Sequence, residues 1–231
     1  MQSQTLPSYA PVSELSAEAR SNFIWRTYGH VAAAILLFAG IETYLFSTGI
    51  ALPMAQSMLQ MNWLVILGGL MVVSWIATHV AHSAQSKPLQ YVALVGVVVA
   101  QAIIFVPMLA IAMAKAPGMI ESAVGVTLLG TGGLTAVALI TRKDFSFLRG
   151  ILVWGGILAL VGIFAAVLFG FELGTWFSVA MIGFAGAAVL YDTSNILQHY
   201  PEDRYVGAAM ALFASIALMF WYVLRLFMSR N

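Results

Sequence analysis

The run ILVWGGILALVGIFAAVLFGF, residues 151–171, contains no charged side chain. A helix of about 20 apolar residues is long enough to cross the hydrocarbon core of a bilayer. Arg149 precedes the run and Glu172 follows it, so charges return only where such a helix would reach the lipid head groups. The stretch therefore predicts a transmembrane α-helix, which we place at residues 147–170.

The composition of the whole chain extends this prediction to most of its length. Of the 231 residues, 61% are hydrophobic and 8% are charged, and the mean hydropathy is +0.94. A soluble domain carries about 25% charged residues, so the sequence excludes a soluble globular enzyme. The alternating segments typical of an outer-membrane barrel are absent. We predict an all-α, polytopic membrane protein.

Further apolar runs of similar length predict that the chain crosses the membrane seven times. The connecting loops are short, so neighbouring helices should pack antiparallel. Pro107 falls inside the third run and should kink that helix. The predicted spans are residues 28–50, 62–83, 89–113, 119–140, 147–170, 175–198 and 206–228.

Residues 1–26 differ from the spans in composition, because they are polar and carry acids and prolines before any apolar run. A cleavable signal peptide would have the opposite character. We predict a flexible cytosolic tail over 1–26 and one seven-helix transmembrane domain over 27–231. Seven Lys and Arg residues lie on the side of the tail and three on the other, which puts the N-terminus in the cytosol. The C-terminus is then outside, unless the last span is re-entrant.

Several chemistries are disfavoured by what the sequence lacks. The chain has no cysteine, which excludes disulfides, thiolate zinc sites and cysteine nucleophiles. Its net charge is +1 and its basic residues are scattered, so we expect no nucleic-acid partner. The short motifs of zinc proteases, phosphate-binding loops and serine hydrolases are missing. We expect no enzymatic activity, no cofactor and no assignable metal site.

Asp192 is the most informative ionisable residue, because it lies well inside the sixth span. It is six residues from Gln198, or about 9 Å from the end of the helix. A charge inside a bilayer is costly, so such a residue is a functional hypothesis by default. Asn195 and His199 share its helix face. We expect this face to line the bundle interior or a water-filled crevice. Asp192 is then either a titratable gate for protons or cations, or a structural carboxylate bonded to neighbouring helices.

Two histidines occupy the cytosolic halves of their spans. His79 lies about four residues from the end of the second span, at a depth similar to that of Asp192, so the two are candidates for a contact. His30 lies near the start of the first span. Each histidine is either a hydrogen-bonded residue of the interface or a partner in proton transfer.

Three further charged residues lie towards the outer side. Glu42 is deep in the first span and, with Asp192, would define a polar route between the two sides of the membrane. Glu121 is close enough to the boundary to be solvated. Arg225 is near the outer end of the last span, where a long basic side chain can reach the interface as an anchor.

Three segments carry a resemblance to a known family. Residues 191–196 (YDTSNI) resemble the sixth-helix signature of the Bax inhibitor-one family, the transmembrane Bax inhibitor motif proteins, which include a bacterial YccA-like branch. Residues 26–30 (RTYGH) and 222–227 (YVLRLF) look like the opening and closing segments of that family. The resemblance covers nearly the whole chain after residue 20.

The resemblance implies six helices around a central seventh, and a pH-sensitive cation leak, chiefly of calcium, gated by two intramembrane aspartates. Asp192 matches the aspartate of the sixth helix, whereas Ser215 occupies the position of the other. Calcium takes six to eight oxygen ligands, and one carboxylate with a hydroxyl supplies few of them. The candidate ion or proton gate is therefore Asp192 with Ser215, Asn195 and His79. Either a group such as His79 or Glu42 replaces the missing carboxylate, or the ion-sensing mechanism has been lost.

The YccA-like branch implies an alternative function in the bacterial inner membrane. In this interpretation the protein does not transport ions, and instead binds and modulates a membrane-anchored AAA protease of the FtsH type. Asp192 would be structural, and the tail over residues 1–26 would suit a degradation handle. The expected partners are thus the lipid bilayer, calcium or protons, and an FtsH-type protease. A metabolite permease is less favoured, because the sequence shows no inverted repeat.

Overall fold

The computed structural model describes residues 11–83 and 86–230, and the described part consists of helices and short connections. Seven of the helices are long and apolar enough to cross a membrane, which confirms the predicted all-α, polytopic fold. The α-helices are α1 (Ala17–Ser47), α2 (Ala51–Gln60), α3 (Trp63–Ser83), α4 (Lys87–Lys115), α5 (Met119–Thr141), α6 (Leu148–Phe169), α7 (Thr175–Gln198) and α8 (Tyr205–Arg230).

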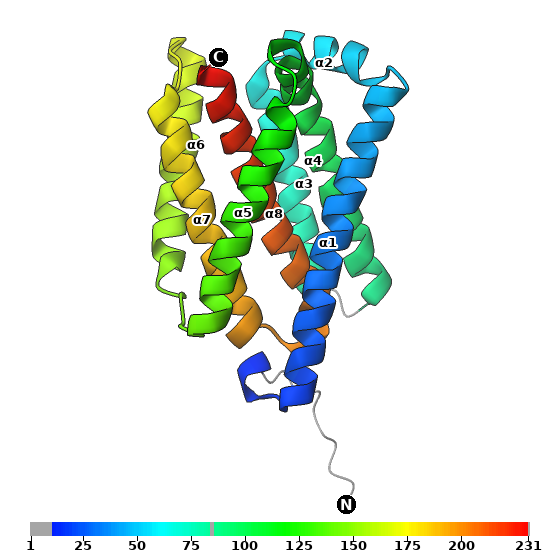
Figure 1. Cartoon of the computed structure of the whole chain (residues 1–231), viewed down its shortest axis with the longest axis vertical. Coiled ribbons are helices and arrows are strands. Elements are labelled where there is room, and N and C mark those ends of the chain that lie inside the picture. The colour runs from blue at the N-terminus through cyan, green and yellow to red at the C-terminus, as the bar shows by residue number, and fades with distance from the viewer. Residues whose placement is uncertain (1–10, 84–85, 231) are drawn as a thin grey trace, which may run out of the picture.

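The last span, α8, is the centre of the bundle (Figure 1). It packs against α1, α3, α4, α5 and α7. Its sequence is apolar on all sides, as expected of a helix surrounded by others. Ala208, Ala209, Leu212 and Leu224 are all buried. The predicted central position of the last span is therefore confirmed, although five of the other spanning helices pack directly on it and α6 packs mainly on α7.

The apolar run of residues 151–171 belongs to the periphery. It forms most of α6, which packs mainly on α7. Trp154 is 68% exposed and Phe169 is 80% exposed. These side chains would face lipid, because exposure of so continuous an apolar surface to water is unfavourable. The segment that most clearly predicts a membrane protein is thus the one that contributes least to the interior.

The short helix α2 is an element that hydropathy did not predict. Its residues fall between the first two predicted spans, where we expected a loop. Pro53 lies in its first turn, where the missing backbone N–H costs no hydrogen bond. Ala51 and Ala55 are buried and pack on Val106 of α4. The helix therefore caps the bundle at the end of α1, as Figure 1 shows.

The beginning of the described chain differs from the expected tail over residues 1–26. Helix α1 begins at Ala17, and Ser16 caps it by accepting a hydrogen bond from the backbone N–H of Ala19 at 3.3 Å. Before it, the backbone N–H of Val12 donates to the carbonyl of Tyr200 at 2.9 Å, and the Val12 side chain is fully buried. Residues 11–26 thus pack on the bundle, whereas 1–10 lie outside the described residues.

The physical reason is that a few apolar side chains decide the packing of this segment. Val12 and Phe23 are both buried in the main core although they belong to a segment rich in polar residues. Arg20 then reaches back, with its Nε donating to the carbonyl of Val12 at 3.2 Å and its Nη2 to that of Ser13. The mean hydropathy of the segment cannot show that two separate apolar residues pack on the same surface.

Substitution of Val12 by Asp tests this docking. A carboxylate cannot be buried there without a partner, so residues 11–16 should detach and Arg20 should lose its carbonyl acceptors. Limited proteolysis with trypsin in detergent, followed by mass spectrometry, should show faster cleavage after Arg20 than in the native chain. Glu14→Gln, an exposed change in the same turn, is the control. Equal cleavage of all three proteins would contradict the packing described here.

Candidate functional site

Asp192 and Ser215 form a hydrogen bond that joins α7 to α8. The Ser215 hydroxyl donates to Oδ2 of Asp192 at 2.6 Å, a distance typical of a hydroxyl–carboxyl pair. Ser215 is only 9% exposed. The two residues that the resemblance equates with an aspartate pair are therefore neighbours in space. A carboxylate and a hydroxyl stand where two carboxylates were expected from the family pattern.

The close approach of helices around this pair depends on a glycine. A Cβ atom built on Gly186, one and a half turns before Asp192, would lie 3.2 Å from Leu134 Cδ1 of α5 and 3.6 Å from Met219 Cε of α8. The distance to Leu134 is tight and that to Met219 is an ordinary contact, so any side chain at this position would have to displace Leu134. Gly186 thus brings α5 and α8 close to α7.

The residues that follow Asp192 in the signature fix the neighbouring loop. Thr193 and Ser194 are fully buried. The Ser194 hydroxyl accepts a hydrogen bond from the backbone N–H of Phe145 at 2.9 Å, in the loop between α5 and α6. The carbonyl of Asn195 accepts from the backbone N–H groups of His199 and Tyr200. The signature therefore positions the carboxyl and also ends α7.

Two tyrosine hydroxyl groups lie near Asp192, towards the C-terminal end of α7. Tyr28 of α1 and Tyr200, just after α7, are both close enough to interact electrostatically with Asp192. Burial, and secondarily the charge of Asp192, raises the pKa of Tyr200 well above its usual value. Its phenol therefore stays protonated. Tyr200 also accepts the hydrogen bond of Val12, so residues 11–16 cover this side.

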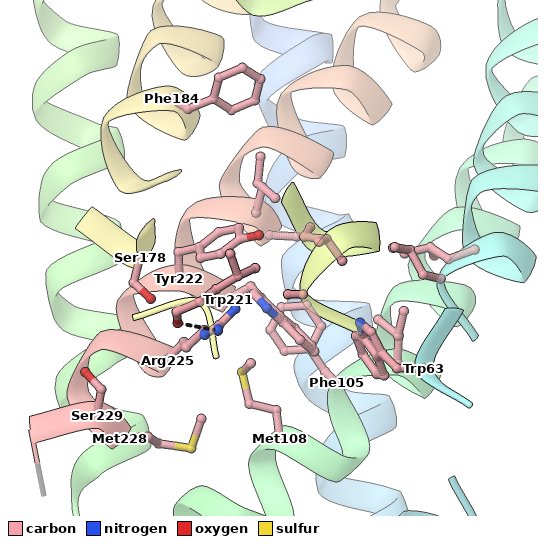
Figure 2. A pocket seen from close by; sticks show the side chains of 18 of the residues that line it. Trp63, Phe105, Met108, Ser178, Phe184, Trp221, Tyr222, Arg225, Met228 and Ser229 are labelled. Atoms are coloured by element: carbon pink, nitrogen blue, oxygen red, sulfur yellow. Dashed lines mark hydrogen bonds between the residues drawn. The ribbon is translucent and has the colours of Figure 1, made fainter. Parts of the chain in front are cut away.

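A cavity of about 1070 Å³ approaches Asp192 from the other end of the bundle. It is lined by residues of α3, α4, α6, α7 and α8 and extends from Arg225 and Ser229 as far as Ser215. Figure 2 shows its aromatic walls at Trp63, Phe105 and Trp221. Asp192 itself does not line the cavity, so the Ser215 hydroxyl separates the open space from the carboxyl.

Arg225 fixes the end of the cavity that is distant from Ser215. Its Nη2 donates to the carbonyl of Leu173 at 2.9 Å, and its guanidinium lies 5.9 Å from the centre of the Phe177 ring. Figure 2 shows the side chain beside Ser178 and Tyr222. We expected an anchor that reaches the membrane interface. The structure instead places the guanidinium in contacts within the protein, where it ties α8 to the loop before α7.

The candidate contact between His79 and Asp192 is not formed in the structure. His79 is on the exposed face of α3, and its ring stacks on Trp75 with a centroid distance of 6.1 Å. The two residues share a depth in the membrane, but depth does not fix the direction in which a side chain points. His79 consequently supplies no substitute for the missing second carboxylate.

Glu42 is buried, but it is not on the route that we expected. It lies near the C-terminal end of α1, whereas Asp192 is near the opposite end of the bundle, and Glu42 does not line the cavity. Its side chain is 7% exposed, and neither carboxyl oxygen accepts a hydrogen bond from a described residue. Burial of an unpaired charge is costly, so the carboxyl is unfavourable there in its ionised form.

The remaining candidates lie at the surface or near it. His199 is exposed, with Nε2 3.6 Å from Oδ2 of Asp144. The pKa of Asp144 is lowered, mainly by the backbone N–H of Ser146, which donates to it. Glu121 is exposed in the first turn of α5. His30 is half-buried and contacts other residues than Asp192.

Sequence reasoning missed Tyr28 and Tyr200 as neighbours of Asp192. A signal for Tyr28 was present, since it falls within the opening segment that resembles the family, residues 26–30. Tyr200 lies in the loop that follows the sixth span, and no sequence pattern indicates that a residue of this loop lies near Asp192. Both supply hydroxyl groups that composition alone cannot assign to a site.

Comparison with known proteins gives a match over most of the chain. Residues 20–231 match the sequence family Bax1-I, described as "Inhibitor of apoptosis-promoting Bax1". The chain is 30% identical to "BI1-like protein" of Arabidopsis thaliana over 94% of its own length and 84% of that protein. "Protein LIFEGUARD 4" of the same plant is 27% identical over 95% of this chain and 90% of its own length.

Bacterial relatives match over a shorter stretch. The chain is 35% identical to "Modulator of FtsH protease YccA" of Escherichia coli strain K12, over 44% of this chain and 47% of that protein. The aligned part thus spans about half the length of this relative. The same extent is found for the "Uncharacterized protein PA2604" of Pseudomonas aeruginosa, at 36% identity over 47% of this chain and 49% of that protein.

Substitution of Ser215 by Ala tests whether the bond to Asp192 supports the fold. Removal of the donor leaves the half-buried Asp192 carboxyl without this partner, which should lower the free energy of unfolding by roughly 1–3 kcal/mol. Thermal unfolding in detergent should show a lower midpoint. Ser122→Ala is the control, since that exposed hydroxyl bonds only the carbonyl of Gly118 in its own helix turn. If both variants unfolded at the native midpoint, the bond would contribute nothing to the stability of the fold.

Proposed function

The chain belongs to the Bax1-I family of integral membrane proteins, and on this premise we propose that it is a pH-sensitive leak for protons or small cations. Asp192 is the titrating group in this proposal, and Ser215 is the residue that an ion or water meets first from the cavity. The observation that carries the proposal is the cavity that ends at the hydroxyl bonded to Asp192. An ionisable residue inside a membrane domain is rarely retained without a partner or a task.

The geometry supports a closed state with one open side. The cavity gives access from the outer end to Ser215. On the other side Tyr200 is covered by Val12 and its segment. Passage would then require that α8 moves against α7, which would break the bond between Ser215 and Asp192 and expose the carboxyl to the cavity. Alternating exposure of one carboxyl to two sides is sufficient to move a proton.

The ligand set favours protons or monovalent cations over calcium. The pair offers one carboxylate and one hydroxyl, whereas calcium takes six to eight oxygen ligands, commonly with several carboxylates. His79 and Glu42 do not complete the set, because they lie elsewhere. The proposed ion is therefore one that a single carboxyl can accept.

We also propose the location and orientation. The excess of Lys and Arg on the side of Lys87, residues 142–149 and residues 199–204 supports a cytosolic N-terminus. A relative named "Inner membrane protein YccA" in Escherichia coli O6:H1 is 35% identical over 44% of this chain. Its name supports a location in the inner membrane of a bacterium. In this orientation the cavity opens away from the cytosol.

Flux through liposomes tests the leading proposal. Native protein, Asp192→Asn and the surface control Asp144→Asn are reconstituted with a pH-sensitive dye or a calcium dye inside. The native chain and the control should pass protons at a rate that depends on pH, with little calcium, because a carboxyl can change its charge. Asp192→Asn should lose the pH dependence, because an amide cannot. If folded Asp192→Asn leaked like the native chain, the transport proposal would fail.

A second candidate function is favoured by the name of a relative. YccA of Escherichia coli is named as a modulator of FtsH protease, and this chain shares 35% identity with it over 103 residues. In this alternative the protein binds a membrane-anchored protease of that type and transports nothing. Asp192 then serves only to join α7 and α8. Neither function requires catalysis by this chain.

Capture of a membrane protease tests the second candidate. The native chain, Asp192→Asn and a chain that lacks residues 1–10 are used as baits in solubilised bacterial membranes. This deletion leaves residues 11–26, which pack on the bundle, in place. An FtsH-type protease should be captured by the native chain and by Asp192→Asn alike. Weaker capture by the shortened chain would show that residues 1–10 serve as the degradation handle. No capture by any folded bait would count against this function.

A further inference from the structure

A second cluster of side chains surrounds Tyr205, at the first residue of α8. The ring centre of His30 lies 5.2 Å from that of Tyr205. Lys87 Nζ, at the start of α4, lies 4.2 Å from the centre of the same ring, and Arg26 Cζ of α1 lies 5.7 Å from it. Three helices that are distant in sequence thus bring two cations to one aromatic ring. With Tyr91 we call these residues the Tyr205 cluster.

Hydrogen bonds hold the middle of the Tyr205 cluster in place. His30 Nδ1 is 2.6 Å from the carbonyl of Arg26, and His30 Nε2 is 3.1 Å from the hydroxyl of Tyr91. The rings of His30 and Tyr91 are also in contact, with centroids 5.5 Å apart. His30 therefore links α1 to α4, and the cations are attached to a fixed frame.

The two cations lie close together, and the acidic residue beside Lys87, Asp203, pairs with another residue. Their distances to the Tyr205 ring bound the separation of the two charges at about 10 Å. Among the described residues, neither Arg26 nor Lys87 forms an ion pair with a carboxylate. Lys87 donates to the backbone carbonyl of Asp203, while the Asp203 carboxylate pairs with Arg204 at 3.3 Å. Residues 1–10 and 84–85 contain no acidic residue.

The Tyr205 cluster is positioned at the expected level of the lipid head groups. Figure 1 shows the start of α8 at the lower end of the molecule, near the lower part of α1. Arg26 is exposed and Tyr91 is 38% exposed. Leu89 and Val92, on either side of Tyr91 in α4, are exposed apolar residues that would face lipid. Aromatic and basic residues at this boundary are typical of membrane interfaces.

We propose that the Tyr205 cluster binds the phosphate group of an anionic phospholipid in the adjacent leaflet. Arg26 supplies a planar guanidinium that can donate two hydrogen bonds to one phosphate, and Lys87 supplies a compact charge with donors left over from the Asp203 carbonyl. A phosphate between them would offset their mutual repulsion. The acyl chains would lie along the exposed apolar face of α4. A zwitterionic lipid would offset less of the repulsion between Arg26 and Lys87, because its head group carries its own cation.

The test compares lipids and matched charge changes. Native protein in a non-ionic detergent is titrated with short-chain phosphatidylglycerol, with phosphatidylcholine of the same chains and with inorganic phosphate, and the unfolding midpoint is measured. Phosphatidylglycerol should stabilise the native chain at several-fold lower concentration than phosphatidylcholine. Arg26→Gln with Lys87→Gln should weaken the phosphatidylglycerol effect roughly tenfold or more. Lys143→Gln with Arg149→Gln is the control, since it removes the same charges from exposed positions on the same side.

Each other outcome would overturn the proposal. An equal loss in the control pair would show that general charge, not the Tyr205 cluster, attracts the lipid. Equal stabilisation by inorganic phosphate would assign the site to a soluble anion, and no preference of the native chain for phosphatidylglycerol would remove the site altogether. Should the double glutamine variant fail to fold, Arg26→Lys with Lys87→Arg keeps both charges. That variant must retain the preference for phosphatidylglycerol, or the proposal fails.

Discussion

A carboxyl group enclosed by apolar helices needs a hydrogen-bond donor, and in this chain the donor to Asp192 is Ser215. The bond joins α7 to α8, the central helix on which five of the other helices pack. Gly186 allows the close approach that makes it, since Met219 and Leu134 occupy the space a side chain would fill. The position of the cavity follows from the same contact, because the open space ends where Ser215 meets α7.

The two sides of this bond are unlike, and the difference suggests how the protein works. On one side the approach to Ser215 is a wide cavity between aromatic walls, and Arg225 at its far end is bonded to the Leu173 carbonyl. On the side that the charge bias assigns to the cytosol, Tyr200 and the segment around Val12 close over the carboxyl. The lipid-facing cluster at Tyr205 lies at the start of α8, the helix that carries Ser215. A lipid bound there would act on the end of the helix that has to move, so the two proposals concern one element while resting on separate contacts.

Hydropathy was sufficient to predict the fold, because a span is defined by the average character of about 20 residues. It could not show α2 or the packing of residues 11–26, which depend on single side chains such as Ala51, Ala55 and Val12. The pairing of Asp192 with Ser215 came from the register of the family signature, not from periodicity. The expected partner His79 failed because a sequence gives depth along a helix but not the direction of a side chain across the bundle. The Tyr205 cluster was out of reach for the same reason, since its cations come from α1 and α4.

The central claim is that the Asp192 carboxyl gains and loses a proton at its position inside the bundle. Infrared difference spectroscopy of the reconstituted protein, recorded as the pH is stepped from mildly acidic to neutral, reads the carboxyl stretch directly. The account predicts a reversible band of a protonated carboxyl that is missing in Asp192→Asn and shifted in Ser215→Ala, where the hydrogen bond is gone. A spectrum in which the native chain and Asp192→Asn change identically with pH would contradict it.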